Sequence, residues 1–131
     1  AAAWSAVERR VNAPLGSIRG ISLAEYRLLH ALAAAPGARA SRVELARAVG
    51  LTPSAVTRAI RPLEALGMIE TVRNERDARQ AVAALTPAGV ELADDAAGVV
   101  RDTMADALAH APQVTRRRAE LLDLLGELAR V

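Results

Sequence analysis

The chain has 131 residues, a formal net charge of +2 and 52% hydrophobic residues, of which very few are aromatic. Its length indicates a single domain whose core is built from leucine, valine, isoleucine and alanine. The absence of cysteine excludes a disulfide framework and a thiolate redox sensor.

Two helices are predicted in the first 35 residues. The first spans about residues 3–12, and we expect it to end at the proline and glycine of residues 14–16 because both are unfavourable inside a helix. The second begins with Ser-Leu-Ala-Glu at residues 22–25, a capping box in which the serine and glutamate side chains bond each other's backbone amides. Its leucine stripe continues to residue 35, where Pro-Gly follows.

A helix-turn-helix is predicted next. A second capping box, at residues 41–44, begins a short helix that Gly50 ends. Thr52 can then cap a further helix, Pro53 suits its first position, and Gly67 ends it. A short helix, a turn that contains glycine and a second helix are typical of DNA-binding helix-turn-helix motifs.

The second of these helices has one apolar and one polar face. Helical spacing places four apolar side chains toward a core: Val56, Ala59, Ile60 and Leu63. The opposite face carries Ser54, Thr57, Arg58 and Arg61. Hydroxyl and guanidinium groups suit the acceptor edges and phosphates of a DNA major groove. A charged outer face is also typical of an ordinary solvated helix, but the helix-turn-helix layout favours DNA.

Pro62 lies inside this predicted helix. It lacks an N–H and its ring crowds the carbonyl of Arg58, so we expect a kink or early loosening of the helix there. Two interpretations stay open: the helix reads its bases before Pro62, or the bend directs Arg61 toward a phosphate.

A β-hairpin is predicted after the helix. Residues 68–73 and 80–85 read as two short strands, joined by the polar segment 74–79. Three arginines lie at or beside its tip, among the acids Glu75 and Asp77: Arg73, Arg76 and Arg79. An arginine on such a wing can enter a narrow minor groove, where the potential is most negative. An ordinary solvated hairpin is the alternative.

Two helices are predicted in the C-terminal third. Thr86-Pro87 begins a long helix whose apolar stripe reaches His110, and Pro112 ends it. The last helix spans residues 114–130 and carries five leucines, a face that would form an exposed apolar patch in a monomer. We expect a second copy of the chain to cover it through the terminal helices of both chains; the alternative is packing onto its own domain.

These motifs together resemble a known family. The segment 51–70, the Asp-x-Arg of residues 77–79 and the Leu-Thr-Pro-Ala-Gly of residues 85–89 are similar to the MarR family of bacterial winged-helix transcription regulators. The resemblance implies a mainly α fold with a small antiparallel β wing. It also implies a winged helix-turn-helix lobe at residues 22–89 and a helical dimerisation region at residues 1–21 and 90–131.

The resemblance further implies a homodimer that binds double-stranded DNA and acts as a repressor. Because the dimer has a two-fold axis, we expect a pseudo-palindromic operator. We expect neither enzymatic activity nor a cofactor. In that interpretation Asp77 braces Arg79, which is the wing arginine. The expected DNA-binding residues are Ser41, Thr52, Ser54, Ala55, Thr57, Arg58, Arg61, Arg73, Arg76, Asp77 and Arg79.

A small-molecule effector is also expected from the family. The residues of the first two helices that could line its site are Trp4, Arg9, Tyr26 and His30. Tyr26 and His30 are four residues apart on one helix face, where aromatic rings could hold a phenolic or aromatic acid. The alternative is that these rings fill a core or an interface.

Charge and residue content bear on the remaining function classes. Residues 1–89 hold 12 arginines and 7 acids, whereas residues 90–131 hold 5 and 8, so the predicted DNA-binding part is the basic one. A winged-helix module that binds protein instead of DNA remains the alternative function. No cluster of histidines with carboxylates and no glycine-rich phosphate loop supports an enzyme, and no metal ligands lie at suitable spacing.

The ends of the sequence carry a few further expectations. No run of eighteen apolar residues is present, and the N-terminal segment is too short for a signal peptide, so we expect a cytoplasmic protein without a membrane partner. The chain begins with alanine, which leaves room for native residues ahead of it.

Overall fold

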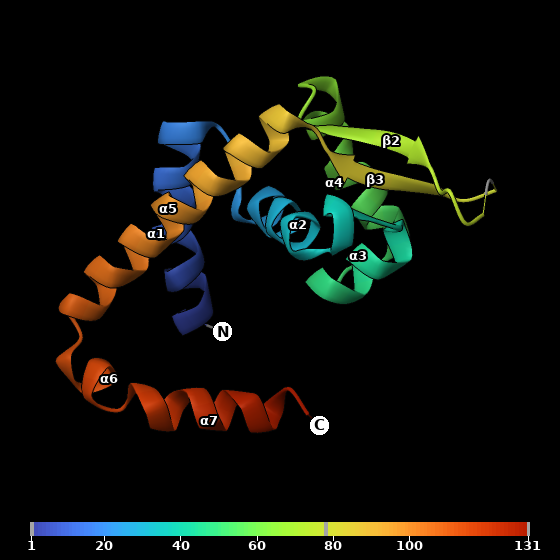
Figure 1. Ribbon diagram of the computed structural model, residues 1–131. Helices are drawn as coiled ribbons and strands as arrows, with labels where there is room; N and C mark the ends of the chain where they lie inside the picture. Colours follow the sequence, from blue (N-terminus) through green and yellow to red (C-terminus); the bar gives the residue numbers. More distant parts are fainter. Residues whose placement is uncertain (1, 78, 131) are drawn as a thin grey trace.

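The computed structural model describes residues 2–77 and 79–130 (Figure 1). Its strands form one small antiparallel sheet, which confirms the predicted mainly α fold with a β wing. The helices are α1 Ala2–Arg19, α2 Leu23–Ala34, α3 Arg42–Val49, α4 Pro53–Ala65, α5 Pro87–Ala109, α6 Pro112–Arg116 and α7 Arg118–Leu128. A 3-10 turn, η1 Pro36–Ala38, precedes the strands, which are β1 Arg39–Ala40, β2 Ile69–Arg73 and β3 Ala81–Leu85.

The sheet has the strand order β1-β3-β2. Ile69 pairs with Leu85 at the base of the wing and Arg73 with Ala81 near its tip. The predicted hairpin is therefore confirmed, although residue 78 of its tip lies outside the described residues. The pairing of β1 with β3 was not predicted, because two residues after a turn carry no periodic signal.

A single apolar core joins the helices to the sheet. The fully buried side chains include Leu28, Leu29 and Leu32 of α2 with Val56 and Ile60 of α4. Both predicted capping boxes are present: Ser22 with Glu25 on α2, and Ser41 with Glu44 on α3. These caps satisfy amides that the first helical turn leaves without a partner, so the helices begin where the sequence predicts.

The first helix is longer than predicted. We expected it to end at residues 14–16, but α1 continues through Pro14 to Arg19. Val11 and Leu15 lie on either side of Pro14 and are 3% and 0% exposed, and α1 packs against α5. Burying such side chains contributes about 1.5 to 3 kcal/mol each, which offsets the hydrogen bond that proline removes.

Pro62 does not end α4 either. The helix runs on to Ala65, and the carbonyl of Pro62 accepts the amide of Leu66 at 3.1 Å. The expected early loosening is therefore wrong. Val56, Ile60 and Leu63 hold the buried face of α4 in the core on both sides of the proline, and Gly67 ends the helix as predicted, with a φ of +74°.

The single C-terminal helix predicted at residues 114–130 is two helices in the structure, α6 and α7, which meet at Arg117. Pro112 has no N–H for the carbonyl of Leu108, and this carbonyl accepts the amide of Ala111 at 3.0 Å and the hydroxyl of Thr115 at 2.9 Å. The Thr115 bond joins α6 to the end of α5, and the chain breaks again at Arg117 before α7 begins.

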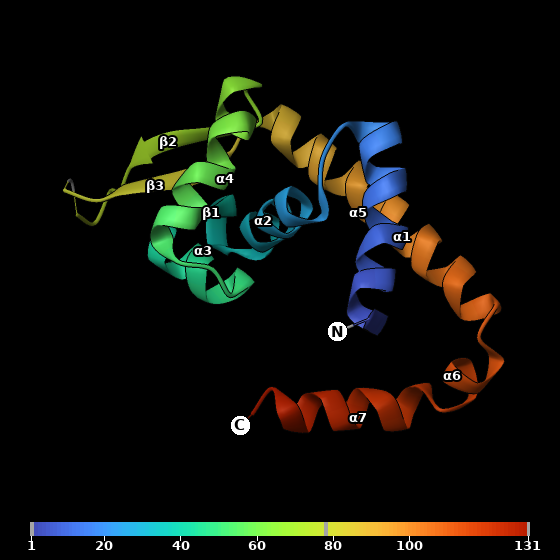
Figure 2. The ribbon, with the colours of Figure 1, turned by 180° about the vertical axis from the view of Figure 1, so that it is seen from behind.

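The long helix α5 connects two parts of the molecule. It begins at the base of the wing, packs along α1 and α2, and leads to α6 and α7 at its far end (Figures 1 and 2). Arg19 of α1 forms an ion pair with Asp95 of α5 at 2.6 Å. The helix-turn-helix and wing thus lie at one end of α5 and the C-terminal helices at the other.

Candidate nucleic-acid interface

The polar face of α4 points outward because its apolar face is fixed in the core. Thr52 caps the helix by accepting the amide of Ala55 at 3.2 Å. Ser54, Arg58 and Arg61 are exposed, as predicted from helical spacing. Thr57 is half-buried, and its hydroxyl donates to the carbonyl of Pro53 at 3.0 Å. It can therefore offer DNA its methyl group and oxygen lone pairs, but its one proton is already used.

Ser41 and Thr52 cap helices and keep a free hydroxyl proton. Each hydroxyl oxygen accepts a backbone amide, from Glu44 at 3.1 Å and from Ala55 at 3.2 Å. A hydroxyl that accepts in this way keeps its own proton, which can be donated to a phosphate oxygen. Ala55 is half-buried, and its amide is already bonded to Thr52, so it has only a methyl group to offer.

A carboxylate that the sequence analysis did not select holds α4 in place. Glu64 Oε1 accepts the hydroxyl of Thr71 on β2 at 2.5 Å and lies 3.9 Å from Nη2 of Arg42 on α3. One side chain of α4 thereby connects this helix to the wing and to α3. No local pattern could reveal it, because its partners are 7 and 22 residues away.

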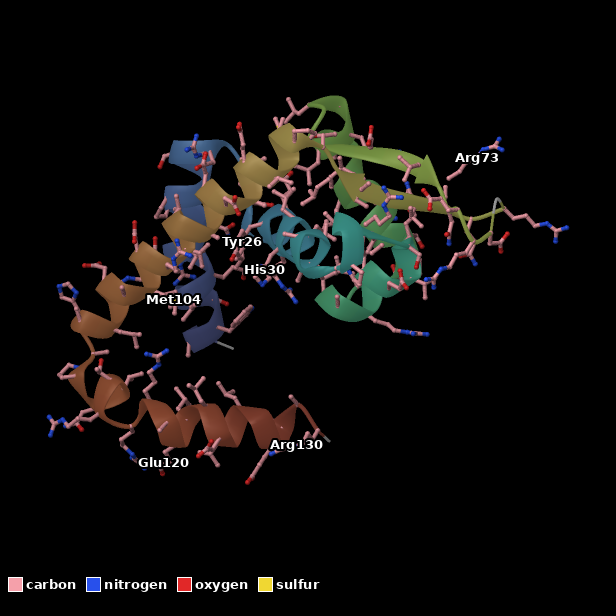
Figure 3. The ribbon with its side chains drawn as sticks, in the orientation of Figure 1. Tyr26, His30, Arg73, Met104, Glu120 and Arg130 are labelled. Atoms are coloured by element: carbon pink, nitrogen blue, oxygen red, sulfur yellow. The ribbon has the colours of Figure 1, made fainter. Side chains whose placement is uncertain are left out.

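Two side chains shape the tip of the wing. Asn74 accepts the amide of Arg76 at 3.0 Å, and Asp77 accepts the amide of Arg79 at 3.0 Å. Asp77 thus bonds Arg79 through the backbone, not through its guanidinium. The side chains of Arg73, Arg76 and Arg79 are exposed, and Figure 3 shows Arg73 pointing away from the wing.

The candidate effector residues are only partly brought together. The rings of Tyr26 and His30 have centroids 5.7 Å apart and an interplanar angle of 34° (Figure 3). Trp4 is 60% exposed on α1 and Arg9 is also exposed, and within residues 2–77 and 79–130 neither forms a hydrogen bond, ion pair or ring contact with that pair.

Two cavities in the described part of the chain are lined by residues other than Tyr26 and His30. One, of about 330 Å³, lies between α6 and α7 and is lined by Val114, Leu121 and Leu124 with polar neighbours. The other, of about 380 Å³, lies between α2 and α3 beside Arg39 and Glu44. The candidate effector residues therefore do not line either cavity in a single chain.

The leucines of α7 are exposed in the single chain. Leu121, Leu122, Leu124, Leu125 and Leu128 are between 44% and 70% exposed. Successive residues of an α-helix are rotated by about 100°, so all of these except Leu122 lie within an arc of about 100°, which forms one stripe along the helix. The structure does not show the alternative, in which this leucine face packs onto its own domain.

Two classes of feature are absent from the part of the chain that the structure describes. None of its helices is both long and apolar enough to cross a membrane. Nor do three or more histidine or carboxylate side chains gather there as ligands for a metal ion.

Comparison with known proteins places this arrangement in a family. A family model described as the MarR family matches residues 19–80. The HTH-type transcriptional repressor Rv2887 of Mycobacterium tuberculosis (strain ATCC 25618 / H37Rv) is 36% identical over 118 residues, which cover 88% of this chain and 82% of the relative. The chain belongs to the MarR family.

Solved structures of MarR proteins share the fold over most of the chain. Sco3205, a MarR family transcriptional regulator from Streptomyces coelicolor, was solved in complex with DNA; it is 26% identical, with a TM-score of 0.80, over 95% of this chain and 80% of its own. Rv2887 was solved in complex with salicylic acid; it is 33% identical, with a TM-score of 0.72, over 92% of this chain and 89% of its own. The fold and family expected from the residues 51–89 are thus confirmed.

Proposed function

We propose that this MarR family regulator binds a pseudo-palindromic DNA operator as a homodimer and represses transcription from it. The observation that carries the proposal is the outer face of α4, where Arg58 and Arg61 are exposed beside the hydroxyl of Ser54 while the inner face is buried. The Sco3205 complex with DNA and the naming of Rv2887 as a repressor support it.

In this proposal the lobe of residues 22–89 reads DNA and residues 1–21 and 90–131 form the dimer. The outer face of α4 enters the major groove, and Arg79 of the wing enters the minor groove. Ser41 and Thr52 donate to phosphates, while Arg73 and Arg76 add charge along the backbone. A dimer then reads two half-sites about one helical turn apart, roughly 10 bp.

The exposed leucines of the terminal helix α7 are evidence for the proposed dimer. A stripe of leucines about half exposed along α7 is an apolar surface of the kind that monomers rarely present to water. A two-fold axis would pack this stripe against the terminal helices of a second copy, which removes it from water. Because the proposed target is chromosomal DNA, the proposal places the protein in the cytoplasm.

A salt titration of DNA binding tests the proposal. The probe is labelled DNA from upstream of the protein's own gene, and the readout is fluorescence anisotropy between about 50 and 200 mM salt. The logarithm of the affinity should fall by about 0.9 per phosphate contact for each unit of log salt. A flat titration, or no binding to any DNA, would reject DNA recognition and favour a protein partner for the same face.

An aromatic acid is proposed as the effector, on the side of α2 that carries Tyr26 and His30, with Trp4 and Arg9 of α1 as further candidates. The salicylic acid complex of Rv2887 supports this class of ligand. A thermal-shift panel of phenolic acids, each followed by release from the operator, tests it. The Tyr26→Ala variant should lose the shift; an unchanged shift would place the ligand elsewhere.

A further inference from the structure

The end of the recognition helix and the start of α5 meet at a tight junction. It consists of Gly67 and Met68, which follow α4, and Thr86 and Gly89, which begin α5. A Cβ atom added at Gly89 would lie 1.9 Å from the carbonyl oxygen of Met68 and 2.9 Å from its carbonyl carbon. Real Cβ atoms do not approach so closely, so only glycine allows this distance between the two backbones.

Thr86 bonds both sides of the junction. Its hydroxyl donates to the carbonyl of Gly67 at 2.6 Å, and its amide donates to that of Met68 at 3.1 Å. The same hydroxyl oxygen accepts the amide of Gly89 at 3.1 Å and so caps α5. One side chain therefore ties the first turn of α5 to the residues that end α4.

This junction leaves no flexible linker between the DNA-reading helix and the helix that leads to the dimer region (Figure 1). In the last turn of α4, Glu64 accepts the hydroxyl of Thr71 and pairs with Arg42, so side-chain bonds join α4 to the wing and to α3 as well as to the base of α5. These bonds and the close backbone approach at Gly89 link the direction of α5 to the orientation of α4.

From this geometry we infer that Thr86 and Gly89 are positioning residues that set the angle between α4 and α5, and thereby the spacing of half-sites that the dimer accepts. The inference rests on the proposed function, since only a DNA-bound dimer has a half-site spacing. The length of α5 sets how far its other end moves when the angle changes. This helix has 23 residues and is about 34 Å long. A tilt of about 6° at one end moves the other by about 3.5 Å, one base-pair step of 3.4 Å.

The test uses operators with the parent's preferred half-sites and a spacer lengthened or shortened by one base pair. The variants are Thr86→Val, which keeps the shape but loses the bonds to Gly67 and Gly89, and Gly89→Ala. The parent should lose about tenfold in affinity for either altered spacer, which is about 1.4 kcal/mol. Each variant that folds should lose about threefold or less in affinity for the altered spacers, or should bind one of them more tightly than the parent's spacer.

Two matched controls separate positioning from stability. Thr86→Ser keeps every hydroxyl bond and should restore the parent's spacing profile. Gly98→Ala lies on the same helix, where an added Cβ would meet only Nη2 of Arg101 at 3.9 Å, so its profile should match the parent. Ser22→Ala removes a helix cap elsewhere and should lower the melting temperature without changing the profile.

The outcomes are distinguishable. If Thr86→Val binds every spacer more weakly but keeps the parent's tenfold preference, the junction only stabilises the fold and the inference is wrong, even where Gly89→Ala fails to fold. If the parent binds no DNA, the proposed function fails and this inference fails with it.

Discussion

The arginines differ in whether they have a partner. Arg19, Arg42 and Arg117 form ion pairs with acids of the same chain. Within the described residues no ion pair involves the arginines of the proposed DNA surface, which are Arg58, Arg61, Arg73, Arg76 and Arg79. A guanidinium without an internal partner gives up no ion pair when it binds a phosphate or a base, so these side chains are ready to bind.

Replacing arginines of α4 and the wing should give different binding phenotypes. Arg58→Ala should cost about 1 to 3 kcal/mol and relax the preference at one base pair, as expected for a bidentate contact to a base. Arg79→Ala should weaken binding while the major-groove preference stays the same. Binding of a single-substitution operator library measures both effects. Parent-like affinity of Arg79→Ala would reject the assignment of the wing.

Acid should weaken the capping box of α3. Glu44 accepts the amide of Ser41 at 2.7 Å, and this hydrogen bond lowers the pKa of Glu44 below its usual value of 4.5. A carboxylate whose pKa is lowered by folding stabilises the native state fully above the unfolded-state pKa. That contribution is lost as the pH falls below about 4.5 and through the lower native pKa.

Urea unfolding at several pH values between 7 and 3 measures this effect. The stability difference between the parent and Glu44→Gln should shrink as the pH falls below about 4.5. Glu8→Gln, which removes an exposed carboxylate on α1, serves as the control and should show no such trend. A difference for Glu44→Gln that stays constant down to pH 3 would contradict the role of the ionised carboxylate.

At the level of helices and strands, the prolines end fewer helices than their local chemistry predicts. Pro53 and Pro87 begin helices as predicted, because a first-turn residue needs no amide partner. Pro14 and Pro62 lie inside helices that continue past them. In both helices the residues around the proline bury an apolar face, and this packing outweighs the missing hydrogen bond.

Pro62→Ala should therefore stabilise the protein. The new amide can donate to the carbonyl of Arg58, whereas the more flexible unfolded chain offsets part of the gain. We expect the free energy of unfolding to rise by about 1 to 2 kcal/mol, measured by urea denaturation at fixed protein concentration. Pro53→Ala, at the first helical position, should give no such gain. A less stable Pro62→Ala protein would mean that the proline shapes α4 in a way that packing requires.

At the scale of the whole molecule, one chain leaves its C-terminal helices incompletely covered. The pocket between α6 and α7 is lined by three apolar side chains, Val114, Leu121 and Leu124, together with polar ones, and the leucine stripe of α7 continues it. Arg117 and Glu120 form two hydrogen bonds of 2.8 Å at its edge. Such an apolar surface with a polar rim has the anatomy of a subunit interface.

A charge placed on the stripe should separate the proposed dimer. Leu125→Arg should give a monomer in sedimentation experiments at concentrations where the parent is dimeric, because an unpaired guanidinium would be buried in the interface. Its DNA affinity should fall by tenfold or more, since one half-site is lost. Asp123→Arg is the matched control, because Asp123 lies about 160° from Leu125 around α7. A dimeric Leu125→Arg protein would place the interface elsewhere.

Features that depend on neighbours within about four residues could be predicted from the order of residues alone. The caps at Ser22, Ser41 and Thr52, the stop at Gly67 and the two faces of α4 follow from local hydrogen bonding and helical periodicity. Family resemblance rested on the same local motifs, which is why residues 51–89 sufficed for it.

Features that depend on distant partners followed from the packing of the folded chain. It carried α1 through Pro14, placed Glu64 between Thr71 and Arg42, and broke the last helix at Arg117. It also brought Gly89 against Met68, a contact across 21 residues that no pattern of residue types encodes. The physical reason is that burial and close backbone approach depend on which surfaces meet in three dimensions, whereas caps and faces depend on spacing along the chain.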